Sequence, residues 1–99
     1  MTSATTPSVQ VRLTAVLQKL TGGQKAIEAR GATVAELFDD IDSRFPGFKA
    51  QMYNDEGKLQ RFVNVYLNDE DIRYTGGVDT AIKQGDVLDV LPALAGGAS

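Results

Sequence analysis

The stretch TVAELFDDIDSRFPG, residues 33–47, has the clearest structural pattern in the chain. Thr33 and Glu36 fit the capping box T-x-x-E, in which two side chains accept hydrogen bonds from backbone N–H groups at the start of a helix. Apolar residues then recur at helical spacing on one stripe: Val34, Leu37, Phe38, Ile41 and Phe45. Because Pro46-Gly47 ends the pattern, we predict an amphipathic helix over residues 33–45.

Two strands are predicted before this helix. An alternation of apolar and polar residues, typical of a strand with one buried face, places three apolar side chains on the same side: Val9, Val11 and Leu13. Thr21-Gly22-Gly23 then predicts a turn. The segment QKAIEA, residues 24–29, is a weaker second strand, with Ile27 as its main inward residue.

The middle of the chain is mixed. Residues 48–60 are expected to form an irregular short helix through Phe48, Met52 and Tyr53. Asp55-Glu56-Gly57 reads as a turn.

The C-terminal third predicts three further strands. RFVNVYLN, residues 61–68, is rich in β-branched and aromatic residues. One face would carry Val63, Val65 and Leu67, and the other Phe62, Asn64 and Tyr66. The acidic turn 69–71 leads to a short strand at 72–74, Gly76-Gly77 closes it, and residues 78–82 would form one helical turn. After a turn at 84–86, the strand 87–93 is apolar on both sides, which favours a central position in the sheet.

This order of elements predicts an α+β fold of the ubiquitin-like β-grasp type. About four to five strands would form a mixed sheet packed on one main helix. The domain would span residues 9–93, after a disordered lead-in at 1–8 and before a flexible tail at 94–99. The expected core is Val11, Leu13, Leu37, Phe38, Ile41, Val63, Val65, Val87 and Leu91.

Composition excludes several classes of function. The sequence has no Cys and no His, which rules out disulfides, thiol nucleophiles, serine–histidine catalysis and thiolate or imidazole metal ligation. With 99 residues there is room for one small domain, which has little means of burying and tuning other catalytic groups. Asp69-Glu70-Asp71 and Asp55-Glu56 lack the glycine-centred loop of a calcium site. We therefore predict no catalytic residue, no metal site and no enzyme activity of its own.

The charge balance and the first residues bear on partners and location. The formal net charge of −3 and the pI near 4.7 argue against nucleic acid or an anionic membrane as the main partner, because both require a basic surface. The start MTSATTPSV has neither the basic nor the apolar region of a signal peptide. Cytoplasmic location is therefore the expectation.

Three Gly-Gly pairs occur, at 22–23, 76–77 and 96–97. The first two lie between predicted elements, where glycine serves turns. The third follows the last predicted strand. Activation of a C-terminal carboxylate with ATP requires threading it into another protein's active site, and two glycines would pass a narrow channel that side chains would obstruct.

The stretch RFVNVYLNDEDIRYTGGVDTAIKQGDVLDVLPALAGG, residues 61–97, resembles the C-terminal half of the ThiS/MoaD family of ubiquitin-like sulfur carriers. The shared features are the strand followed by Asn68 and an acidic turn, the Gly85-Asp86 turn, and the last strand running through Leu91-Pro92-Ala93 into Gly96-Gly97. TGGQK, residues 21–25, and the capped helix also match, so the resemblance covers roughly residues 9–97. It is greatest for the branch that serves cysteine biosynthesis in actinobacteria.

The resemblance implies a carrier and not a catalyst. In this family an E1-like enzyme of the MoeB/ThiF type adenylates the terminal glycine carboxylate, and sulfur replaces AMP to give a thiocarboxylate. Gly97 would carry the reactive carbonyl, Gly96 would be the slim threading residue, and Leu94-Ala95 the stem of the recognised tail. No cofactor would be bound, and ATP would be used by the activating partner. The acceptor would be a cysteine synthase or, alternatively, the large subunit of molybdopterin synthase.

One feature departs from the family pattern. Activated members end at Gly-Gly, whereas here Ala98 and Ser99 follow. Some relatives carry a two-residue cap that a JAMM-type metalloprotease removes, so the bond between Gly97 and Ala98 is the expected processing site. The alternative is that the two residues are a cloning remnant or leave the protein inactive.

Two questions stay open at the level of sequence. Phe62, Tyr66 and Tyr74 would form an exposed patch for the activating enzyme or would be ordinary sheet packing, and Arg12, Arg61 and Arg73 would join that surface or simply solubilise it. The function would be that of a sulfur carrier in cysteine or molybdopterin synthesis. The alternatives are a ubiquitin-like modifier joined through Gly97 to lysines, or a plain interaction domain with an inert tail.

Overall fold

The computed structural model describes residues 6–60 and 63–92. Its strands are β1 (Ser8–Leu13), β2 (Ala26–Arg30), β3 (Val63–Leu67), β4 (Glu70–Asp71) and β5 (Val87–Pro92). Its α-helices are α1 (Ala15–Gln18), α2 (Val34–Arg44) and α3 (Phe48–Met52). Short 3₁₀ helices occupy Lys19–Thr21, Ile72–Tyr74 and Gly77–Asp79.

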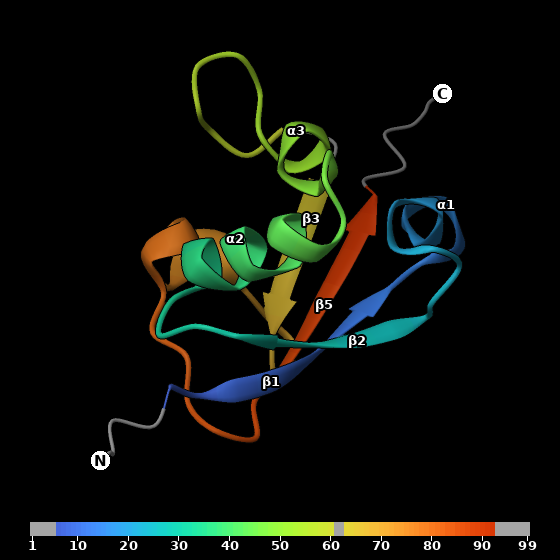
Figure 1. Ribbon diagram of the computed structural model, residues 1–99. Coiled ribbons are helices and arrows are strands. Elements are labelled where there is room, and N and C mark those ends of the chain that lie inside the picture. Colours follow the sequence, from blue (N-terminus) through green and yellow to red (C-terminus); the bar gives the residue numbers. More distant parts are fainter. Residues whose placement is uncertain (1–5, 61–62, 93–99) are drawn as a thin grey trace.

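The strands form one mixed sheet in the order β2-β1-β5-β3-β4. β1 and β5 run parallel, with Val11 opposite Leu88, and the other neighbouring pairs are antiparallel. α2 lies across one face of the sheet (Figure 1). The β-grasp arrangement is confirmed, and so is the central position of the last strand.

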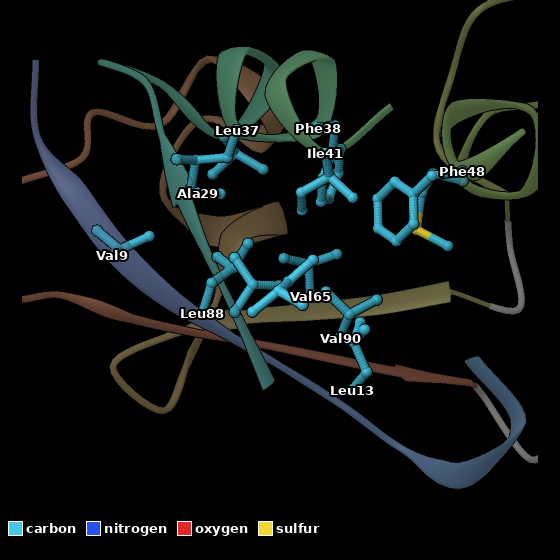
Figure 2. Packing of buried hydrophobic residues seen from close by; sticks show 14 of the residues in the cluster. Val9, Leu13, Ala29, Leu37, Phe38, Ile41, Phe48, Val65, Leu88 and Val90 are labelled. Carbon is cyan, nitrogen blue, oxygen red and sulfur yellow. The ribbon is translucent and has the colours of Figure 1, made fainter. Parts of the chain in front are cut away.

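The core lies between α2 and the covered face of the sheet (Figure 2). Apolar side chains from both layers are buried there, and they include Val11, Leu13, Leu37, Phe38, Ile41, Val63 and Val65, as predicted. Val87 and Leu91 were wrong predictions, because β5 turns Leu88 and Val90 inward. Side chains alternate along a strand, so Val87, Asp89 and Leu91 share one face. The carboxylate of Asp89 is costly to bury, and this face is therefore the one that α2 does not cover.

The predicted cap of α2 is confirmed, with one difference. The Thr33 hydroxyl accepts a hydrogen bond from the Glu36 N–H at 3.2 Å. The Glu36 carboxylate, however, accepts from the N–H of Ala32 at 2.8 Å and not from that of Thr33. The helix ends at Arg44, before Pro46-Gly47. Both side chains therefore hold the first turn against the chain that enters it.

Four local predictions need correction. Ile72–Tyr74 is a 3₁₀ helix and not a strand, because the Asp71 carboxylate accepts from the Arg73 N–H at 2.9 Å and caps a turn that buries Ile72. The segment 78–82 has its helical turn earlier, at Gly77–Asp79. α1 and the 3₁₀ helix after it fill the first connection, where only a turn at 21–23 was predicted. β1 begins at Ser8, one residue earlier than expected.

Gly31 lies against the first turn of α2 with no room for a side chain. An added Cβ atom would lie 2.7 Å from Glu36 Cβ and 2.8 Å from the Leu37 nitrogen. The Gly31 N–H also donates to the Pro7 carbonyl at 3.1 Å. Glycine is therefore required here by the close approach of two backbone segments.

Gly31→Ala is expected to lower the free energy of unfolding by about 1–3 kcal/mol, because the helix must move to admit the methyl group. Ala32→Gly is a matched control at the next position, where the side chain is exposed, and should cost less than about 1 kcal/mol. Urea denaturation followed by circular dichroism measures both. A Gly31→Ala variant as stable as the parent would contradict this packing.

Candidate functional site

The place where the chain leaves the sheet defines the candidate site. β5 ends at Pro92, which lies opposite Val63 at the start of β3. On the other side β5 pairs with β1, whose last residue Leu13 lies opposite Val90. α1 follows β1 and contacts β5 (Figure 1). β5 therefore ends in the centre of the sheet, between two strands that hold it in place.

The other end of β5 is anchored by one side chain. Asn68 adopts a left-handed backbone with φ of 52°, which asparagine tolerates better than most residues. Its side-chain oxygen accepts from the Val87 N–H at 3.0 Å, and its amide donates to Asp86 at 3.0 Å. Asp86 in turn accepts from the Lys83 N–H at 2.8 Å. The Asn68 and Gly85-Asp86 features thus join two turns and set where β5 begins.

The outer sheet face, opposite α2, carries an ion pair at its centre. Arg12 Nε donates to Asp89 Oδ1 at 2.6 Å, and Arg12 Nη2 donates to Asp89 Oδ2 at 2.8 Å. The two residues are direct neighbours in the β1–β5 register. Tyr66 on β3 is the other neighbour of Asp89. Hydrogen bonding to Asp89 raises the pKa of Arg12 above its ordinary value.

Two arginines bind backbone carbonyls, one on the edge strand β2 and the other at the start of β3, where β4 does not pair with it. Arg44 donates to the Glu28 carbonyl at 2.6 Å and to Asp40 at 2.9 Å on the β2 side. Arg73 donates to the Val63 carbonyl at 3.1 Å and to the Asn64 side chain at 2.9 Å on the β3 side. Such contacts oppose pairing of an edge strand with another chain.

The described residues hold only part of the predicted site. Gly97, Gly96, Ala95, Leu94 and Ala98 lie outside them, as do Phe62 and Arg61. Tyr66 is partly exposed on the outer sheet face. Tyr74 is 84% exposed on the 3₁₀ helix after β4. The aromatic partner surface therefore stays a prediction.

The described residues offer neither a metal-binding cluster nor a membrane-spanning helix. Across residues 6–60 and 63–92, no cluster of three or more acidic side chains could hold a metal ion. Within the same ranges, no helix has the length and apolar character needed to cross a bilayer. Burial raises the pKa of Tyr53, which packs edge-on against Phe38, and the carboxylate of Asp39 raises that of Lys49. Both groups belong to the helical side of the domain.

A family model describes nearly the whole chain. Residues 11–97 match the ThiS family. This chain belongs to the ThiS family. The match begins in β1 and ends at Gly97, and Ala98 and Ser99 follow it.

Named relatives agree with this membership. The sulfur carrier protein CysO of Mycobacterium tuberculosis is 42% identical over 92 residues, which cover 91% of this chain and 99% of the relative. A chain of the crystal structure of the Amycolatopsis orientalis BexX/CysO complex is similar with a TM-score of 0.83 and 52% identity, and the match covers 90% of this chain and 99% of that one. Small archaeal modifier protein 3 of Haloferax volcanii is 32% identical over 78 residues, 76% of this chain and 84% of the relative. The resemblance to ThiS-family carriers, and to CysO in particular, is confirmed.

Sequence reasoning missed the pairing of Arg12 with Asp89. Arg12 could be assigned to the outer sheet face, since it alternates with the apolar residues of β1, whereas Asp89 could not, because its strand is apolar at both parities. β1 and β5 are adjacent and parallel, and this pairing brings together two residues that are 77 positions apart in the sequence. The alternation of polar and apolar residues within each strand does not determine how the two strands pair. The signal available was the lone carboxylate within the apolar strand VLDVLP.

Proposed function

We propose that this protein is a sulfur carrier whose Gly97 carboxylate, after removal of Ala98 and Ser99, is adenylated and converted to a thiocarboxylate. The observation that supports this most is that the family match ends at Gly97. The relatives that bear the name sulfur carrier protein CysO cover almost the whole chain. The central strand of the sheet leads directly into the segment that ends at this glycine.

The proposed chemistry takes two steps. A Gly97 carboxylate oxygen attacks the α-phosphorus of ATP, pyrophosphate leaves, and an acyl adenylate forms. A sulfide sulfur then attacks the Gly97 carbonyl carbon, the bond to the phosphate oxygen breaks, AMP leaves, and the thiocarboxylate remains. The chain has no His and no Cys, so the groups that move protons and deliver sulfur belong to an E1-like partner of the MoeB/ThiF type. ATP is bound by that partner.

We further propose that the sulfur enters cysteine biosynthesis. The tail pattern from Leu91 to Gly97 and the segments RFVN and NDED are the sequence features behind this choice, and the similarity to CysO supports it. The acceptor is an activated serine held by a cysteine synthase, and a JAMM-type metalloprotease then releases the product. Cytoplasmic location is part of the same proposal.

The thiocarboxylated 97-residue form is expected to lose its sulfur when mixed with a cognate cysteine synthase, O-phosphoserine and the JAMM-type protease. The thiocarboxylate sulfur attacks the activated serine, phosphate leaves, and the cysteine formed stays attached to Gly97 until hydrolysis releases it and restores the carboxylate. Intact-mass analysis over time measures this loss. The carboxylate form of the same chain is the control and should not react. Retention of sulfur by the thiocarboxylated form in this mixture, together with dithiolene formation on a molybdopterin synthase large subunit, would assign the protein to the alternative pathway.

A second candidate function has one observation in its favour. The 32% identical relative from Haloferax volcanii is named a modifier protein, and a modifier uses the same adenylated glycine. The two functions differ in the product at Gly97. A carrier gives a thiocarboxylate, whereas a modifier gives an isopeptide bond to a lysine of another protein. Tryptic mapping of the adducts formed in cell extract therefore separates them.

A further inference from the structure

The Arg12 guanidinium is held by Asp89 through only some of its N–H donors. Its Nε and Nη2 atoms each donate one hydrogen bond to Asp89, and within residues 6–60 and 63–92 the guanidinium makes no other hydrogen bond. A guanidinium has five N–H donors, so the edge formed by its two terminal nitrogens still has donors to offer. The Arg12 side chain is 54% exposed and that of Asp89 is 17% exposed. Asp89 thus orients the fork while the free edge stays accessible to solvent.

This free edge lies on a surface that the activating partner must approach. Asp89 is three residues before Pro92, where the described chain ends. Gly97 lies five residues beyond Pro92, so its carbonyl cannot be more than about 17 Å from the end of the sheet. A standard interface covers about 800 Å² on each protein. An enzyme that encloses Gly97 therefore extends over the neighbouring sheet faces, and within residues 6–60 and 63–92 no helix lies across the outer one (Figure 1).

The local charge decides which acceptor fits. The positive charge of Arg12 is already compensated by Asp89, and the nearby carboxylate of Asp69 adds further negative potential at this point. A second carboxylate brought to the guanidinium would be repelled by both acidic groups. A neutral oxygen, from a main-chain carbonyl or a side-chain amide, accepts the same hydrogen bonds without that repulsion.

From this geometry we infer that Arg12 is a recognition residue for the E1-like activating enzyme, and that its free N–H edge donates to neutral acceptor oxygens on that enzyme's surface. The inference rests on the proposed function. Because Asp89 fixes the fork beforehand, little side-chain entropy is lost on docking. Arginine is also among the residues that dominate binding energy at interfaces.

The decisive variant exchanges the two residues, Arg12→Asp with Asp89→Arg, in the 97-residue form. The exchange keeps the net charge and allows the ion pair to form again, but it moves the free fork from β1 to β5. The matched control exchanges another ion pair, Asp39→Lys with Lys49→Asp, whose charged atoms are 2.6 Å apart on the helical side of the domain. Thermal unfolding, and kcat and KM for thiocarboxylate formation, are measured for each.

The exchange at 12 and 89 is expected to raise KM by about tenfold with kcat and Tm little changed, as for loss of an interface anchor. The control exchange should leave KM unchanged. The ratio of the KM of the 12/89 exchange to the KM of the control exchange should persist at high salt, because the acceptors are neutral. An unchanged KM for the 12/89 exchange would overturn the inference, and a KM ratio that collapses at high salt would overturn the neutral acceptor.

Arg12→Lys guards against a misfolded exchange variant. Lysine keeps the charge opposite Asp89 but lacks the planar fork, so KM should again rise several-fold while Tm is retained. A wild-type KM for this variant would also overturn the inference. Failure of the proposed function gives a different result, since the unsubstituted 97-residue form would then gain no sulfur at all.

Discussion

Phe38→Ala is expected to lower the free energy of unfolding by about 3–5 kcal/mol, the largest loss of stability that we predict for a single substitution in this domain. Phe38 is fully buried in the middle of α2. Its ring packs against Phe48 with centroids 5.6 Å apart and against Tyr53 at 6.1 Å. Truncation would remove both aromatic contacts and leave a cavity between α2, α3 and the sheet.

Urea denaturation of the full chain measures this loss, with equal slopes required for the comparison. Tyr74→Ala is the matched control, because Tyr74 is an aromatic residue that is 84% exposed, and it should change stability by less than about 0.5 kcal/mol. Phe38→Leu should fall between the two, since leucine fills part of the cavity. A loss below about 1 kcal/mol for Phe38→Ala would show that α2 does not form the centre of the core.

Elements with a clear local pattern could be predicted from the sequence. α2 was predicted because its capping residues and its apolar stripe agree, and β1 because polar and apolar residues alternate strictly. β3 was predicted from its β-branched and aromatic residues, and its buried face, with Val63 and Val65, was predicted correctly. In each case the information lies within about one dozen residues, which is the range over which periodicity acts.

Features that depend on distant residues could not be predicted in the same way. In β5 four apolar residues surround Asp89, so that both parities looked possible until the covered face was known. The strand expected at 72–74 is a 3₁₀ helix because a local cap by Asp71 coincides with burial of Ile72. At the candidate site, the end of the last strand was predictable to within one residue, but the Arg12–Asp89 pair required the parallel pairing of β1 with β5.

The 99-residue form is expected to be inert toward the activating enzyme, whereas the form ending at Gly97 is expected to react. In the longer form the Gly97 carbonyl is part of a peptide bond and has no carboxylate oxygen with which to attack ATP. Its only terminal carboxylate is that of Ser99, which lies two residues further on. To reach the α-phosphate it would have to carry the side chains of Ala98 and Ser99 through a channel suited to glycine.

Control forms separate the position of the carboxylate from its mere presence. A form that ends at Ala98 has a free carboxylate one residue too late and should stay inert. Gly97→Ala in the 97-residue form keeps the position but adds a methyl group, so it should react more slowly. A cognate JAMM-type protease should convert the 99-residue form to the active one, because small residues flank the Gly97–Ala98 bond on both sides.

The central claim is tested most directly by the intact mass of the 97-residue and 99-residue forms after separate incubation with the cognate activating enzyme, ATP and a sulfide source. We predict that only the 97-residue form gains the mass of an oxygen-to-sulfur exchange, located at Gly97 by fragmentation. The same gain in both forms, with Ala98 and Ser99 still attached to the longer one, would contradict the account.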